Sequence, residues 1–439
     1  AVAWGGWVAL AGAAGMLVGA VALPDDRPEP VPPWPLLARP VELLAVAGAM
    51  GGALGMVWWG LEIEESSRFT SYVAFATFAS VALSRLGVFE WLLGLFVRHR
   101  SLTVGAAGLT AALFPFTQGG DAYWLRVFAS VGVFAAAAIG LNVVVGLAGL
   151  LDLGYVAFFG VGAYAGGLLG GAGLSTLDIH LPFLLVVLLG ALISAAFGVV
   201  IGAPTLRLRG DYLAIVTLGF GEIFRIAAFN SDDLTRGPNG IGRIPDLEIA
   251  GFNLGERHEL FGVELSSFAN YYLAELILLA GVILVFSRLN DSRIGRAWVA
   301  IREDETAAAA MGVDTVRMKL LAFAIGAFMA GAAGTVNAHV VSQVVPGSYE
   351  FEQSIFFVAA VVLGGMGTVP GALLGSALLF VIPEKLRAFQ DKRFLLFGVA
   401  LVIMMRFRPE GLVPSRRRQR ELHDASGADA LSAPPGGTL

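Results

Sequence analysis

The stretch that decides the fold is GLNVVVGLAGLLDLGYVAFFGVGAY, residues 140–164. It is almost entirely apolar, and six of its residues are glycines. Only Asn142, Asp152 and two tyrosines bring polar groups into it. Apolar runs of about 20 residues are long enough to cross a bilayer as a helix. Glycine allows close helix packing and also tolerates broken helices that line a cavity. The stretch therefore predicts membrane helices and leaves both roles of its glycines open.

The rest of the chain has the same character. Of its 439 residues, 56% are hydrophobic and only 14% are charged, with a mean hydropathy of +0.75, whereas soluble domains carry about 25% charged residues. This composition predicts an all-α polytopic membrane protein with about 10–13 transmembrane or re-entrant helices. The strongest candidates are 2–23, 41–61, 127–151, 182–206, 268–286 and 320–342, and the weaker ones are 69–83, 101–116, 156–173, 212–227, 355–364, 371–382 and 394–405. The run at 2–23 lacks the basic start of a signal peptide, so we interpret it as a membrane anchor.

Basic residues predict the orientation of the chain. Residues 287–319 hold six of them, residues 406–420 hold another six, and RLRGD at 207–211 adds two. Cytoplasmic loops are enriched in arginine and lysine, so these segments and the C-terminus are expected to be cytoplasmic. The acidic loop at 228–267 is expected on the outside.

Composition changes along the chain suggest three regions. Residues 1–116 form an N-terminal membrane extension that contains a proline-rich connector at 24–35. Residues 117–415 form the working core, and residues 416–439 form a cytoplasmic tail expected to be disordered.

The sequence lacks the residues that ATP binding, metal binding and enzyme catalysis would require. The only lysines are Lys319, Lys385 and Lys392, and none of them lies in a Walker A loop, so the chain is not expected to bind ATP in that way. The chain has no cysteine, and its five histidines lack ligand spacing, so no metal or cofactor is predicted. The net charge of −5 argues against nucleic acid as a partner. No motif predicts an enzyme.

Polar residues within apolar runs are costly in a membrane and therefore informative. Glu222 and Arg225 are three residues apart and can pair on one face of a helix. Glu275 fits a position near a helix end that faces water.

A charged, alanine-rich stretch, REDETAAAAMGVD at 302–314, predicts a short helix between two apolar ones. Asp304 can cap its start and Gly312 can end it. Ala307, Ala310 and Met311 would form a small apolar face that needs a partner.

The preceding stretch, SRIGRAWVAIR at 292–302, is expected to support this short helix. It places Ile294, Trp298 and Ile301 on one helix face with arginines around them. That pattern is typical of a helix lying at the membrane surface.

The short helix resembles the EAA loop of ABC-importer permeases. Ala307, Ala308 and Gly312 match that pattern, Thr306 replaces its glutamate, and its later Ile-x-Leu-Pro is missing. More specific are residues 140–164, LRLRGDYLAIVTLGFGEIFRI at 206–226, TRGPNGI at 235–241, IGRAWVAIREDE at 294–305 and FRPEGL at 407–412. Together, over about 125–412, these stretches resemble branched-chain amino acid permeases of the LivM type. Asp152 stands where many members of that family have serine.

The resemblance implies a permease subunit of a bacterial inner-membrane ABC importer for leucine, isoleucine and valine, with 117–415 as its permease core. It also implies membrane lipid around the chain and, as partners, two ATPase subunits that bind ATP in trans, a second related permease and a periplasmic substrate-binding protein. The implied ATPase-coupling residues are Glu303, Asp304, Glu305, Thr306, Ala307, Ala308 and Gly312. The implied translocation path contains Asn142, Gly146, Asp152, Gly160, Tyr164, Thr217, Glu222 and Asn337.

Three alternatives stay open on the sequence. They are an importer of the same family for urea or short amides, a secondary transporter driven by an ion gradient, and a membrane scaffold.

Overall fold

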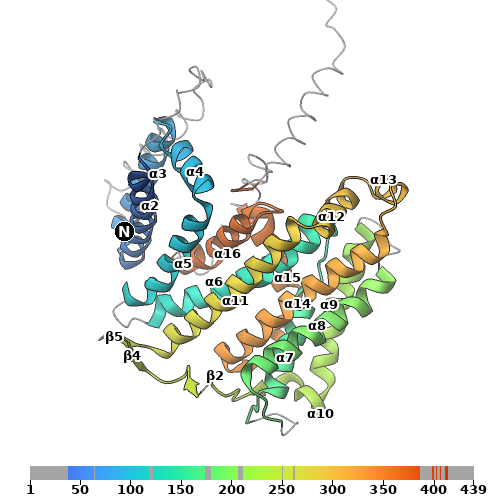
Figure 1. Ribbon diagram of the computed structural model, residues 1–439. Helices are drawn as coiled ribbons and strands as arrows, with labels where there is room; N and C mark the ends of the chain where they lie inside the picture. Colours follow the sequence, from blue (N-terminus) through green and yellow to red (C-terminus); the bar gives the residue numbers. More distant parts are fainter. Residues whose placement is uncertain are drawn as a thin grey trace, which may run out of the picture. The chain divides into compact units, whose positions relative to one another are not determined.

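The computed structural model describes residues 38–63, 65–117, 122–173, 179–205, 211–249, 251–260 and 263–385, together with 398–399, 402, 406 and 411–413. The chain divides into two compact units, Ala1–Gly120 and Asp121–Leu439. Both are built mainly of α-helices (Figure 1). The sequence-predicted helices at 2–23 and 394–405 and the predicted tail lie wholly or mostly outside the described residues.

The first unit contains four described helices, α2 (Arg39–Glu62), α3 (Ser66–Arg85), α4 (Val88–Arg98) and α5 (Arg100–Thr117). The predicted runs at 41–61, 69–83 and 101–116 correspond to α2, α3 and α5. The sequence analysis missed α4, because its 11 residues are too few to cross a bilayer and a search for long apolar runs passes over it.

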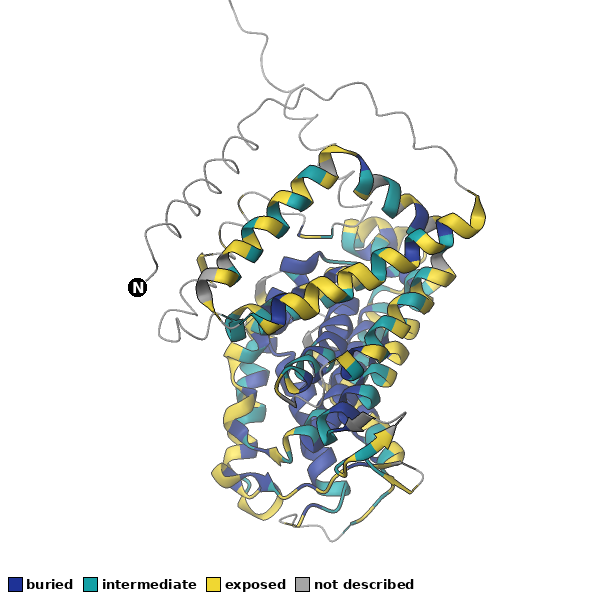
Figure 2. Cartoon of the chain, turned by 90° about the vertical axis from the view of Figure 1, so that its left-hand side faces the viewer, coloured by how far each residue is buried: buried dark blue, intermediate teal, exposed yellow. Residues whose placement is uncertain are grey.

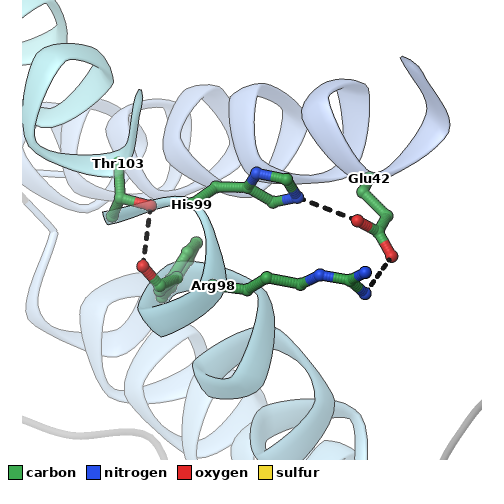
Figure 3. A network of polar contacts seen from close by, with 5 residues as sticks. Glu42, Arg98, His99 and Thr103 are labelled. Atoms are coloured by element: carbon green, nitrogen blue, oxygen red, sulfur yellow. Dashed lines mark hydrogen bonds and ion pairs between the residues drawn. The ribbon is translucent and has the colours of Figure 1, made fainter. Parts of the chain in front are cut away.

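A buried glutamate ties three of these helices together (Figure 3). Glu42 of α2 is only 3% exposed. Its carboxylate accepts a hydrogen bond from Arg98 Nη1 at 3.1 Å and lies 2.8 Å from Nε2 of His99, at the junction of α4 and α5. Thr103 Oγ1 closes the same junction by donating to the carbonyl of Phe96 at 3.3 Å. A buried carboxylate needs such partners, so this cluster fixes the turn between α4 and α5 against α2.

The second unit contains the remaining helices. Long ones are α6 (Ala122–Asn142), α8 (Phe183–Thr205), α9 (Asp211–Asn230), α11 (Ser267–Asn290) and α14 (Thr315–Val341), and shorter apolar ones are α7 (Val156–Leu169), α15 (Phe351–Gly364) and α16 (Val369–Lys385). Short polar elements connect them: α10 (Asp232–Thr235), η2 (Gly237–Asn239), α12 (Arg293–Glu303), α13 (Glu305–Ala310) and η3 (Pro346–Tyr349). Among the described residues of both units, six helices are long and apolar enough to cross a membrane.

The central helix of this unit is α14, which packs against α6, α7 and α8. Small residues bring these helices close: Gly162 of α7 faces the backbone of Gly331 on α14. Thr335 Oγ1 lies 2.9 Å from the carbonyl oxygens of both glycines, and Ser194 Oγ of α8 donates to the carbonyl of Phe158 at 2.9 Å. Close approach and interhelical hydrogen bonds are what hold helices together in lipid. Figure 2 shows the buried residues gathered among these helices.

The two ends of α14 differ. Its first residue follows α13, and its last is followed by β6 (Gln343–Val344), which pairs antiparallel with β1 (Ile241–Gly242). Two further hairpins, β2 (Glu248–Ile249) with β3 (Phe252–Asn253) and β4 (His258–Leu260) with β5 (Val263–Leu265), precede α11. At 27 residues, α14 is about 40 Å long. The loop 231–266 and α13 therefore lie at opposite ends of the helical core (Figure 1).

The sequence prediction of one span over 127–151 is wrong at its C-terminal end. The α-helix stops at Asn142 and continues as a π-helical turn, η1 (Val143–Leu147). The chain then leaves the helix at Gly149, whose φ of +70° lies in the left-handed region that glycine tolerates. Residues 148–155 are irregular before α7 begins. Hydropathy does not reveal this break, because the residues on both sides of it are apolar.

Candidate functional site: a capped surface helix and a broken membrane helix

The predicted short helix is α13. Asp304 caps it by accepting hydrogen bonds from the backbone N–H groups of Thr306 at 2.8 Å and Ala307 at 3.0 Å. It ends before Gly312, whose φ is +87°. Asp314 caps α14 in turn. The sequence prediction of a capped helix with a glycine stop is confirmed.

One side of α13 is left uncovered by the chain. Ala307 and Ala310 are exposed, and Met311 is 85% exposed. Ala308 points the other way and is only 5% exposed. The uncovered apolar side is therefore made by the residues that the sequence predicted for it, while Ala308 packs inward against this chain.

Contacts on the inner side hold α13 and α12 in place. Glu305 forms an ion pair with Lys319 of α14 at 2.6 Å. Trp298 of α12 is fully buried, and its Nε1 donates to the carbonyl of Met318 at 2.6 Å. The expectation that the apolar face of 292–302 lies at the membrane surface is wrong, since Trp298 and Ile301 are buried in protein. The pattern of apolar residues on a helix does not distinguish lipid from a neighbouring helix.

Asn142 and Gly146 lie together at the break in α6. Asn142 is fully buried, its Oδ1 accepts from the N–H of Gly367 at 2.7 Å, and its Nδ2 donates to the carbonyl of Thr368 at 3.0 Å. A Cβ at Gly146 would lie 2.7 Å from the Gly367 nitrogen, so only glycine fits there. The break is thus clamped to the turn between α15 and α16.

Asp152 and Thr217 are joined where α9 crosses the irregular segment. Asp152 is 1% exposed, and its Oδ1 accepts from the N–H of Gly154 at 2.9 Å. Thr217 Oγ1 accepts from the N–H of Leu153 at 3.1 Å and donates to the carbonyl of Ala214 at 3.0 Å. The carboxylate therefore shapes a backbone turn that the Thr217 hydroxyl also holds.

Gly160 and Tyr164 lie further along α7, in an aromatic cluster. The ring of Tyr164 is 6.1 Å from that of Phe224 on α9 and 6.0 Å from that of Tyr349 in η3, and these two rings are 6.3 Å apart. Gly160 has no side chain to block Phe224. The sequence analysis missed Phe224 and Tyr349, since aromatic residues in apolar runs carry no signal of their own.

The other polar residues singled out in the sequence do not join the groups at the break or the aromatic cluster. Arg225 Nε donates to both carboxylate oxygens of Glu222 at 3.0 Å, so the pair predicted on one helix face is formed. Asn337 is half-buried on α14, and within the described ranges no hydrogen bond joins it to the other predicted path residues. The interpretation of Glu275 as water-facing is wrong: it is 1% exposed in the third turn of α11, because α6 covers that face.

This arrangement defines a class of protein. Apolar helices long enough to cross a bilayer surround a broken helix, and a short capped helix at one end presents an uncovered apolar side. Those are features of a polytopic membrane protein with a surface helix whose apolar side is open to a partner.

Comparison with known proteins specifies the class. The family described as branched-chain amino acid transport system / permease component matches residues 123–405. The chain is 43% identical over 307 residues to the high-affinity branched-chain amino acid transport system permease protein LivM of Salmonella typhimurium (strain LT2), which covers 66% of this chain and 70% of that protein. It is 42% identical over 311 residues to the LivM protein of Escherichia coli (strain K12), covering 67% and 71%. The LivH permease protein of the same E. coli strain is 26% identical over 285 residues, covering 64% and 91%.

No solved structure matches the chain. The chain belongs to the family of permease components of branched-chain amino acid transport systems. It is a multi-pass membrane permease of an ABC importer.

Proposed function

We propose that this chain, as one permease subunit, carries leucine, isoleucine and valine across the inner membrane, driven by two ATPase subunits, one of which docks on α13. The observation that carries the proposal is the pair of LivM relatives, both named for high-affinity branched-chain amino acid transport and both more than 40% identical over about two thirds of this chain. These two relatives favour this substrate over urea or short amides, and favour an ATP-driven importer over an ion-coupled carrier or a scaffold.

The proposed docking element is α13 with its flanking residues. The exposed Ala307, Ala310 and Met311 would enter an apolar groove of the ATPase, while Glu303, Asp304, Glu305, Thr306 and Gly312 shape and rim the helix. Ala308 would act from the inner side by seating α13 on this chain.

The other proposed partners follow from the two ends of α14. With α13 in the cytoplasm, the loop 231–266 would face outward, toward a periplasmic binding protein. The arginine-rich segments 287–319 and 406–420 support this orientation and a cytoplasmic C-terminus. A second permease related to LivH would complete the pathway. Asn142, Gly146, Asp152, Gly160, Tyr164, Thr217, Glu222 and Asn337 remain the proposed path residues.

The test is ATP-dependent uptake of labelled leucine by vesicles that contain this chain, the second permease, the ATPases and the binding protein. We expect excess valine to compete and urea to have no effect. Uptake that proceeds without ATPases under an ion gradient would contradict the proposal, and so would competition by urea but not by valine.

Docking is tested separately with Ala307→Glu. The side chain of Ala307 is exposed in this chain, so the variant should fold, but it would place an unpaired charge in the proposed contact, which costs several kcal/mol. We expect the copurified ATPase to fall by roughly tenfold or more. The matched control is Gly347→Glu, an exposed position with open space at the other end of α14, which should keep its ATPases. Equal ATPase recovery with both variants would refute docking on α13.

A further inference from the structure

A single arginine joins the support of α13 to the break in α6. Arg302 is in the last turn of α12, immediately before Glu303 and the cap of α13. Its Nη1 donates to the carbonyl of Gly146 at 2.9 Å, and its Nη2 forms an ion pair with Glu303 at 2.8 Å. The side chain is 21% exposed, because it lies across the backbone of Gly149.

The accepting carbonyl belongs to the last turn of η1. Carbonyl groups at the end of a helix lack an N–H partner from a following turn. Here the chain leaves the helix at Gly149, and the guanidinium of Arg302 supplies the missing donor to Gly146. A Cβ at Gly149 would meet the Arg302 side chain at 3.0 Å or less, so the path of the chain at the break and the position of Arg302 depend on each other.

Asn142, at the start of η1, continues this connection. Asn142 holds the turn that contains Gly367 and Thr368. Thr368 Oγ1 lies 3.1 Å from the carbonyl of Val413, and the N–H of Val413 donates to the carbonyl of Gly364 at 2.8 Å. Hydrogen bonds therefore run from α12 through the broken helix to the turn between α15 and α16 and to the segment 411–413.

We infer that Arg302 is a positioning residue that couples movement of α13 to the conformation of residues 143–151. This inference rests on the proposed docking of an ATPase subunit on α13. The contacts of Glu305 with Lys319 and of Trp298 with Met318 fasten α13 and α12 to α14, which is a continuous helix. The Arg302 contact instead reaches a helix that is already broken, and a broken helix with alternative backbone hydrogen bonds is the kind of element that can adopt two arrangements.

The experiment compares Arg302→Gln, Arg302→Lys and Arg296→Gln in the complete complex with ATPases, second permease and binding protein. Arg296 is the matched control: it lies on the same helix and is exposed, and among the described residues its side chain donates only to the carbonyl of Asp291, at 3.2 Å. This chain contains no cysteine, so Leu151→Cys, at a residue 38% exposed beside the break, gives the chain a single thiol, and its labelling rate, read on the separated permease, reports on 143–151.

We expect Arg302→Gln to keep its ATPases and their ATP hydrolysis while leucine uptake falls about tenfold or more, the effect of one lost charge-assisted hydrogen bond. The Leu151→Cys labelling rate should change on ATP binding in the background of intact Arg302 and should not change with Arg302→Gln. Arg302→Lys keeps the positive charge and N–H donors but loses the planar fork of the guanidinium, so it should recover part of the uptake. Arg296→Gln should behave as wild type.

Three results would overturn the inference. They are nucleotide-dependent labelling that persists with Arg302→Gln, equal uptake by Arg302→Gln and Arg296→Gln, and loss of the ATPases together with uptake in Arg302→Gln, which would make Arg302 a docking residue. If Arg302→Gln does not accumulate in the membrane, Arg302→Lys is measured in its place. The inference is then refuted if Arg302→Lys shows both the nucleotide-dependent labelling and the leucine uptake of the wild type. Failure of the wild-type complex to import leucine would instead refute the proposed function.

Discussion

The contact between α7 and α14 gives a prediction that can be worked out from backbone positions. A Cβ added at Gly162 would lie 2.5 Å from Cα of Gly331 and closer still to its carbonyl oxygen. Non-bonded carbon atoms normally approach to about 3.5 Å, so in Gly162→Ala the two helices must separate by roughly 1 Å. The opposing atoms are backbone atoms, so no side chain can rotate away to relieve the clash.

The expected loss of stability has two parts. Overpacking of this kind typically costs about 1–3 kcal/mol, and the rigid backbone partner places this case near 3 kcal/mol. Separation also stretches the contact of Thr335 on α14 with the carbonyl of Gly162 on α7, a hydrogen bond worth about 0.6 kcal/mol in a membrane protein. The total is about 3–4 kcal/mol. On the scale of soluble domains of about 200 residues, this lowers the midpoint of thermal unfolding by roughly 6–15 °C.

The assay is thermal unfolding of the purified permease in detergent, followed by loss of monodisperse protein. The control is Gly281→Ala in the middle of α11, where an added Cβ meets nothing within 4 Å. There the better helix propensity of alanine should leave stability unchanged or raise it by up to about 1 kcal/mol. If Gly162→Ala unfolds at the same temperature as Gly281→Ala, the close packing of α7 on α14 is refuted.

Three further changes test the site. Asp304→Ala removes the cap of α13, worth about 1 kcal/mol, so ATPase capture should weaken while permease abundance stays at wild type; unchanged capture would contradict the role of the cap. Trp298→Phe keeps an aromatic ring but leaves the carbonyl of Met318 without its donor, which should lower the unfolding midpoint by an amount equivalent to about 1–3 kcal/mol, with a further loss because the phenyl ring is smaller than the buried indole. Asn142→Leu keeps the branched shape of the side chain but leaves the N–H of Gly367 and the carbonyl of Thr368 unpaired, so the loss should be about 2–4 kcal/mol. A wild-type midpoint would show that these two hydrogen bonds do not stabilise the break.

Local signals in the sequence determined much of this protein. Hydropathy located most of the membrane helices, because a helix in lipid needs a long apolar run whatever surrounds it. The cap at Asp304, the stop at Gly312 and the pairing of Glu222 with Arg225 were also predictable, since each depends on residues within one helical turn.

The tertiary structure decided what those local signals leave open. Hydropathy does not distinguish a continuous helix from a broken one, so the π-helical turn at 143–147 and the left-handed Gly149 were not predicted. Periodicity shows that a face is apolar or polar without showing what covers it, which is why Trp298 and Glu275 proved to be buried in protein.

The connections through the break depend on tertiary structure most of all. Arg302 contacts Gly146 across 156 residues of sequence, and Asn142 contacts Gly367 across 225. No local pattern specifies such pairs, because every residue has a backbone carbonyl and nearly every residue has a backbone N–H. The packing of the helices around α14 determines which side chain reaches which backbone group. The sequence therefore determines which segments cross the membrane and where α13 begins and ends, while the packing of the helices determines which residues connect α13 to the broken helix.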